Sequence, residues 1–179
     1  MFGDDAKTIA YRTISSGSDC PRPDLITLTP PRKLDLGELG DDPFVGSGWY
    51  DPENVGGPQA RWAGEIPTST LRLILPRADL RVRLRATAYP HNQTVTIFVN
   101  SHLVTTIPLV EDWAEYEFTL PATVLSVDRP NTIALEHAHL ESAFERTQGR
   151  TDDKRPLAAA YDYIAFEPIG SGPAGQDSK

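Results

Sequence analysis

The chain has 179 residues, with 17 lysine and arginine residues against 25 aspartate and glutamate residues, which gives a formal net charge of −8 at pH 7. This length suits one domain with a substantial core, and the negative charge opposes binding to nucleic acid or to anionic lipid. No stretch approaches the roughly 20 apolar residues of a membrane-spanning helix, so we expect neither a nucleic-acid partner nor a membrane span.

The two ends of the chain differ in composition from the middle. Residues 1–24 are polar and rich in proline and serine, and residues 169–179 have the composition of a disordered tail. We therefore expect a flexible extension over 1–24, one domain over 25–168 and a disordered tail over 169–179. The first residues carry acids where a signal peptide has a basic region and an apolar run, so we expect no export and a cytoplasmic location by default. The lone Cys20 rules out an internal disulfide.

Alternation of apolar and polar residues is the strongest local pattern. In residues 80–88 every second residue is apolar, which predicts a half-buried strand with one wet face. The same period of two occurs at residues 70–75, 94–99, 102–109, 115–120, 131–137 and 158–167. Turn-forming residues separate these segments, which is typical of an all-β antiparallel sandwich of about eight strands.

The faces of these strands predict the core. The residues expected on the inner faces are Leu73, Val82, Leu84, Val95, Ile97, Phe118, Leu135, Ile164 and Phe166. Helix has little room: residues 140–146 favour a helix of about two turns ended by Gly149, and residues 122–126 favour one short turn.

An aromatic loop precedes the first long strand. Residues 48–62 hold two of the three tryptophans, Trp49 and Trp62, and also Tyr50, among glycines and prolines that oppose regular structure. Flat rings stack on the C–H faces of sugars, while charged side chains bind sugar hydroxyls. One interpretation is therefore a ligand site of Trp49, Tyr50, Glu53, Arg61 and Trp62. The other is that the tryptophans pack the loop onto the sandwich.

Four segments together resemble a known family. They are the loop from Gly48 through Trp49, Tyr50, Asp51, Pro52 and Glu53 to Arg61 and Trp62, VTIFVNSHLV at 95–104, WAEYEFTLP at 113–121, and AYDYIAFEP at 160–168. They are similar to galactose-binding-like jelly rolls, the sandwich of many carbohydrate-binding modules and of domains appended to bacterial surface-polysaccharide glycosyltransferases. The resemblance implies a jelly roll over about residues 25–168, a structural turn at 99–104, a calcium ion near Asp162, and a cell-surface or periplasmic location.

Other polar residues carry alternatives. His137 and His139 lie at i and i+2 and could chelate a metal on a strand, but a hydrogen-bonded pair at a pocket edge fits the same spacing. The acids at 35, 38, 41 and 42 supply the oxygen ligands that a calcium ion needs, but they lack the order of an EF-hand loop, and we interpret them as solvated loop residues. The basic residues at 146, 150, 154 and 155 favour a cap on a mobile loop.

The sequence thus predicts a noncatalytic module that recognises a glycan through the aromatic loop, with no cofactor except the calcium implied by the resemblance. The glycines beside Ser47 do not fall at the positions that a G-x-S-x-G nucleophile elbow requires, and no strand-turn-helix pattern follows, so we expect no enzyme. The alternative is an extrinsic structural or interaction subunit of a larger protein assembly, for which association with a membrane is one option. The predicted partners are accordingly a glycan or a protein assembly.

Overall fold

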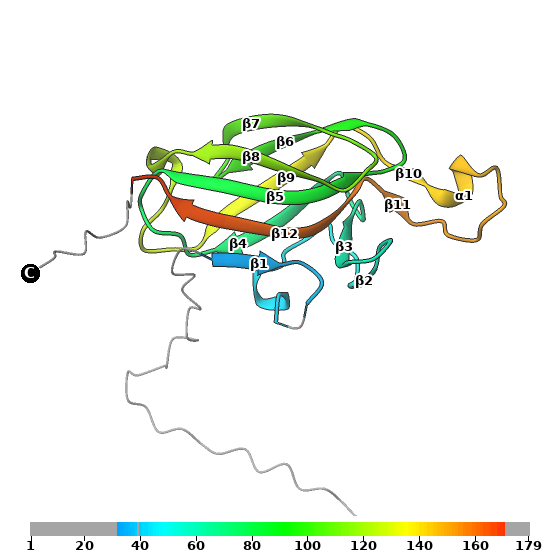
Figure 1. Ribbon diagram of the computed structural model, residues 1–179, viewed down its shortest axis with the longest axis horizontal. Coiled ribbons are helices and arrows are strands. Elements are labelled where there is room, and N and C mark those ends of the chain that lie inside the picture. The colour runs from blue at the N-terminus through cyan, green and yellow to red at the C-terminus, as the bar shows by residue number, and fades with distance from the viewer. Residues whose placement is uncertain (1–31, 39, 171–179) are drawn as a thin grey trace, which may run out of the picture.

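The computed structural model describes residues 32–38 and 40–170, and they form two antiparallel sheets packed face to face (Figure 1). The six-stranded sheet contains β1 (Arg32–Asp35), β2 (Glu53–Asn54), β3 (Gln59–Ala63), β5 (Leu80–Ala88), β8 (Ala114–Leu120) and β12 (Ala159–Pro168). The four-stranded sheet contains β4 (Thr68–Leu73), β6 (Gln93–Val99), β7 (His102–Leu109) and β9 (Asn131–His137). The predicted antiparallel β-sandwich is confirmed.

Strand β12 organises the six-stranded sheet. The strand order is β2-β3-β12-β5-β8, and β12 pairs with β5 along nearly its whole length. On the other side of β12, its first residues pair with β3 and its later residues pair with β1. The short strands β1 and β3 therefore depend on this one long strand for their hydrogen bonds.

The chain crosses repeatedly between the two sheets, as in a jelly roll. From β4 the chain passes to β5 in the opposite sheet, returns for β6 and β7, crosses to β8, returns for β9 and ends in β12. The four-stranded sheet has the order β4-β9-β6-β7. Apolar residues on the facing sides of the two sheets fill the space between them.

The long strands lie where the alternation in the sequence predicts them, whereas the short elements were predicted only in part. The segments predicted from alternation correspond to β4 through β9 and to β12, with β5 spanning the predicted residues 80–88. The short turn η2 (Ala122–Val124) lies within the predicted 122–126, and a second one, η1 (Asp42–Phe44), was not predicted.

The helix predicted over 140–146 is shorter than expected. Residues 141–142 form β10 (Glu141–Ser142), which pairs with β11 (Pro156–Leu157), so only α1 (Ala143–Arg146) remains helical. Ser142 and Glu145 form a capping box at its start, and Gln148 and Gly149 have positive φ angles just after it. Strand pairing therefore takes the first residues of the predicted helix.

The predicted core is buried with one exception. Phe118 is only half-buried because it lies on β8, an edge strand of its sheet. A residue that was not predicted, Tyr161, is fully buried beside Ile164 and Phe166. A bulge between Tyr161 and Tyr163 shifts the register of β12 against β5, so Tyr161 and Ile164 both face the core.

The predicted domain limits lie at the margins of the described chain. Residues 1–31, which include Cys20, and residues 171–179 lie outside the described residues. Ile169, the first residue of the predicted tail, donates its backbone N–H to the carbonyl of Asp79 at 2.8 Å. The limits at 24 and 169 stay predictions.

The contrast between Ile164 and Phe118 gives a stability test. We expect Ile164→Ala to lower the free energy of unfolding by about 2–5 kcal/mol, because it leaves a cavity in a closed core. Phe118→Ala should cost less, since part of its ring is already in contact with water. Urea denaturation of both variants measures the difference, and an equal or larger loss for Phe118→Ala would contradict the assigned burial.

Candidate functional site

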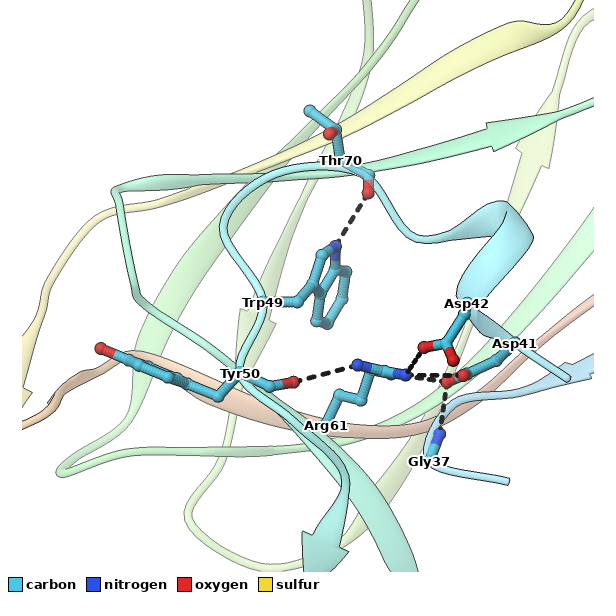
Figure 2. A network of polar contacts seen from close by, with 7 residues as sticks. All are labelled: Gly37, Asp41, Asp42, Trp49, Tyr50, Arg61 and Thr70. Atoms are coloured by element: carbon cyan, nitrogen blue, oxygen red, sulfur yellow. Dashed lines mark hydrogen bonds and ion pairs between the residues drawn. The ribbon is translucent and has the colours of Figure 1, made fainter. Parts of the chain in front are cut away.

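Trp49 is an anchor of the aromatic loop. Its side chain is 7% exposed, and its residue forms an isolated bridge with Ala63 of β3. The indole Nε1 donates to the carbonyl of Thr70 at 2.8 Å (Figure 2), and the ring meets Tyr161 edge-on at 5.4 Å between centroids. For Trp49 the ligand-site interpretation is wrong and the packing interpretation holds, because its ring is buried and its N–H is hydrogen-bonded inside the sandwich.

Arg61 is also buried, with 5% of its surface exposed. Its guanidinium donates to both oxygens of Asp41, through Nε at 2.6 Å and Nη2 at 2.7 Å, and Nη1 donates to the carbonyl of Tyr50 at 3.2 Å (Figure 2). Nη2 also donates to Asp42. The hydrogen bonds to Asp41 raise the pKa of Arg61 and outweigh the opposing effect of burial.

These contacts correct two predictions. Arg61 has no free donor face to offer a ligand, because its donors are used inside the protein. Asp41, expected to be solvated, is buried and also accepts the backbone N–H of Gly37 at 2.7 Å. Asp42 is exposed as expected. A buried guanidinium needs such partners, since an unpaired charge inside a protein is costly.

Tyr50 and Trp62, the neighbours of these anchors, lie on the outside. The backbone N–H of Tyr50 donates to the carbonyl of Trp62 at 2.9 Å, and the Tyr50 ring points away from Arg61 (Figure 2). Trp62 pairs with Ala160 on the outer face of the six-stranded sheet and meets Tyr89 edge-on at 5.6 Å. The residues Tyr50, Trp62 and Tyr89 are all half-buried.

Two arginines border these rings. Arg155 lies over Tyr50 at 5.2 Å from the ring centroid, and Arg146 lies over Tyr89 at 5.4 Å. Both come from the protrusion of β10, α1 and β11 (Figure 1). We call the group formed by Tyr50, Glu53, Trp62, Tyr89, Arg146 and Arg155 the outer aromatic surface.

Ion pairs hold the border of this surface in place. Arg155 donates to Glu53 at 3.0 Å and to Asp153 at 2.8 Å. The hydrogen bonds to Asp153 raise the pKa of Arg155, and Arg155 in turn lowers the pKa of Asp153. Arg146 donates to the carbonyl of Pro90 and lies 3.6 Å from Glu111. The arginines expected to cap a mobile loop therefore connect the protrusion to the sandwich.

Of the five predicted ligand residues, the structure brings Tyr50, Glu53 and Trp62 together outside and places Trp49 and Arg61 inside. Sequence reasoning missed Tyr89, which follows β5 without any motif around it. Burial raises the pKa of Tyr50 and of Tyr89, and the Tyr50 hydroxyl donates to the carbonyl of Pro156 at 3.2 Å. The surface thus offers ring faces, a hydroxyl and fixed charges, which suit stacking and hydrogen bonding.

Asp162 has a cation for a partner. It lies at the bulge of β12, and its Oδ2 accepts from Nη1 of Arg85 at 2.7 Å. A calcium ion at this carboxylate would have to displace a guanidinium of the same sign. Nowhere in residues 32–38 and 40–170 do three acidic, histidine or cysteine side chains gather as a metal would need. The geometry around Asp162 does not fit the calcium implied by the resemblance.

The two histidines do not form a pair. His139 is exposed, while His137 is 4% exposed and lies between the carbonyl of Pro67 and the hydroxyl of Tyr161. Nδ1 is 3.1 Å from the carbonyl, which can only accept, so Nδ1 donates and Nε2 accepts from Tyr161 at 3.0 Å. Burial lowers the pKa of His137 to about 4. The metal-chelating alternative is wrong for this pair.

Comparison with known proteins finds likeness only among solved structures. No family model matches the sequence, and no curated protein matches it. One similar structure is the C-terminal family 6 carbohydrate-binding module of a laminarinase from Zobellia galactanivorans, with a TM-score of 0.48, 7% identity, and 76% of this chain and 98% of that chain covered.

A family 35 carbohydrate-binding module from Clostridium thermocellum has a TM-score of 0.47 and 11% identity, covering 75% of this chain and 97% of that chain. A family 36 module in complex with calcium and xylotriose has a TM-score of 0.43 and 13% identity, covering 76% of this chain and 99% of that chain. In the described part of the chain, no helix is long and apolar enough to span a membrane.

The inward side chains of the loop should contribute to stability. We expect Trp49→Ala to cost about 3–5 kcal/mol through the cavity it leaves, and Arg61→Ala to cost about 3–5 kcal/mol by stranding Asp41. Arg77→Ala is the control, at an exposed arginine that forms no ion pair with the described residues, and it should stay within about 0.5 kcal/mol of the parent. Urea denaturation gives all three values, and a loss below about 1 kcal/mol for Trp49→Ala would contradict its role as an anchor.

His137 should make stability depend on pH. The folded pKa of about 4 lies below the ordinary 6.5, so between these values the unfolded chain binds a proton that the folded chain does not. Stability therefore falls as pH decreases from about 6.5 to about 4, by about 3 kcal/mol in total from this residue.

The matched variant is His137→Gln, which keeps a donor and an acceptor but does not titrate. The difference in free energy of unfolding between the parent and His137→Gln should change across this pH range, while the ion-paired carboxylates contribute equally to both proteins. A difference that stays constant from neutral pH to pH 4, or an imidazole that titrates at its ordinary pKa by NMR, would contradict the assignment.

Proposed function

We propose that this protein is a noncatalytic glycan-binding module that holds a sugar through the outer aromatic surface. One observation carries the proposal: Trp62, Tyr89 and Tyr50 gather half-exposed rings at one edge of the sandwich, with Arg146 and Arg155 stacked on two of them. The set retains Tyr50, Glu53 and Trp62 from the sequence-based site and replaces Trp49 and Arg61 with Tyr89 and the two arginines.

The chemistry of this surface matches a sugar in two ways. Sugar rings have C–H faces that stack on aromatic rings, and their hydroxyls bind charged groups in fixed positions. Here the charged groups are preorganised, because Arg155 already pairs with Glu53 and Asp153. Because these side chains are already ordered, the entropy cost of ordering them on binding is small. An open site of modest affinity needs this cost to be small.

Affinity electrophoresis tests the proposal directly. Gels containing xylan, galactomannan or laminarin should retard the parent protein in at least one case, and Trp62→Ala should abolish that retardation because the stacking ring is lost. Xylan is included because a structurally similar module was solved with xylotriose. Trp62→Tyr should restore part of the retardation, since it keeps a flat ring.

Tyr163→Ala is the control. Tyr163 is a half-buried aromatic on the same sheet that contacts Lys33 and Glu115 rather than the outer aromatic surface, so its loss should leave retardation unchanged. Thermal denaturation confirms that each variant is folded. Unchanged retardation of folded Trp62→Ala, or no retardation of the parent by any of the polysaccharides, contradicts the proposal and favours the alternative of docking onto a protein assembly.

A further inference from the structure

A hollow of about 670 Å³ lies on the outer face of the four-stranded sheet. It is lined by residues at the end of β6, in the turn to β7 and at the start of β9, among them Phe98, Ser101, Arg129 and Thr132. The outer aromatic surface lies beside the protrusion at the opposite end of the sandwich (Figure 1). The hollow is therefore separate from the surface proposed above, and its volume falls in the range of small-molecule sites.

The floor of the hollow is apolar. Phe98 on β6 pairs with Ala134 on β9, and both are half-buried on the face that points away from the core. The next outward residue on β9, Thr132, borders the same floor. An aromatic ring beside an alanine gives a flat apolar platform, because the short methyl group leaves room above it.

The rim of the hollow is fixed by Asn100. This residue has a φ of 51°, and with Ser101 at 69° it forms the tight turn between β6 and β7. Its amide donates to the carbonyl of Val124 at 2.8 Å and to Oδ1 of Asn131 at 2.7 Å, and its Oδ1 accepts the backbone N–H of Thr132 at 3.1 Å. Hydrogen bonds to two separate segments, η2 and the start of β9, keep the rim preorganised.

Two arginines beside the hollow have no carboxylate partner within residues 32–38 and 40–170. Arg129 is exposed and donates only through Nε, to the Ser126 hydroxyl at 3.2 Å. Arg72, also exposed, pairs across β4 and β9 with Thr132. Most other arginines in the described part of the chain have carboxylate partners: Arg61, Arg81, Arg83, Arg85, Arg146 and Arg155.

The geometry points to a second ligand site, and we propose that the hollow binds an acidic saccharide, a sugar ring that carries a carboxylate or sulfate group. The C–H face of the ring lies on Phe98, and the acidic group binds Arg129, with Arg72 adding attraction. In a chain of net charge −8, two guanidinium groups that lack a carboxylate partner among the described residues and lie next to one apolar floor favour an anion there and a ring above it. This site stands independently of the proposed function at the other end.

The test uses the full chain and two ligands that differ only in charge. Isothermal titration with trigalacturonate should show binding, and its methyl ester, which keeps the rings and removes the charge, should bind at least about tenfold more weakly. A sulfated galactan oligosaccharide distinguishes a preference for sulfate from one for carboxylate. The backbone NMR signals of Phe98, Thr132 and Ala134 should shift on titration, whereas those around Trp62 should not.

Variants separate the two parts of the site. Phe98→Ala removes the platform and Arg129→Gln removes the charge, and each should weaken binding of the acidic ligand by about tenfold or more. Arg150→Gln is the matched control: it makes the same charge change at an exposed arginine of the protrusion, and should change the affinity by less than about twofold because salt screens distant charges. Trp62→Ala should leave the affinity unchanged.

Several results would overturn the proposal. They are no binding of either acidic ligand, equal binding of the methyl ester, equal losses in Arg129→Gln and Arg150→Gln, and shifts that map to Trp62. Binding of inorganic sulfate that survives in Phe98→Ala, without saccharide binding, would reduce the hollow to an anion site and reject the sugar. Dimerisation that buries Phe98 and excludes trigalacturonate would make the face a protein interface. None of these outcomes decides whether the outer aromatic surface retards a neutral polysaccharide, so the two proposals fail separately.

Discussion

The buried guanidinium of Arg61 fixes the side of the molecule that carries the outer aromatic surface. A charge inside a protein is tolerated only when its donors are met, and Arg61 obtains its partners from Asp41, Asp42 and the carbonyl of Tyr50. These partners belong to segments with little regular structure of their own. Because the guanidinium holds them in one place, the backbone on which Tyr50 stands is set from within, and its ring is left on the outside.

The long strands could be predicted because their burial follows a period of two, which the sequence displays directly. The short strands could not: β1 and β3 exist because they pair with opposite ends of β12 on the same edge, a relation that appears only after the chain has folded. The bulge in β12 is equally invisible in the sequence. It turns Tyr161 into the core, where strict alternation from Ile164 would have placed it outside.

The candidate site was predictable in composition but not in orientation. The glycines and prolines around residue 49 gave no sign that it pairs with β3. Pairing of this kind sends the side chains of neighbouring residues to opposite faces of the sheet. The aromatic loop therefore contains both alternatives that its sequence left open: Trp49 is an anchor, while Tyr50 and Trp62 face outward. Tyr89 and Arg155 lie far along the chain from this loop and carry no local motif, so only the fold could bring them to it.

This division by orientation lets stability and recognition vary separately at adjacent positions. The side chain of Arg61 belongs to the interior, and that of its neighbour Trp62 belongs to the surface. A substitution at Trp62 can then change what the surface contacts without leaving a buried charge unpaired, whereas a substitution at Arg61 disturbs the loop on which Tyr50 depends. A scaffold of this kind can keep its core residues while its outer residues change. The two sets of residues lie on the same backbone, but their side chains make separate contacts.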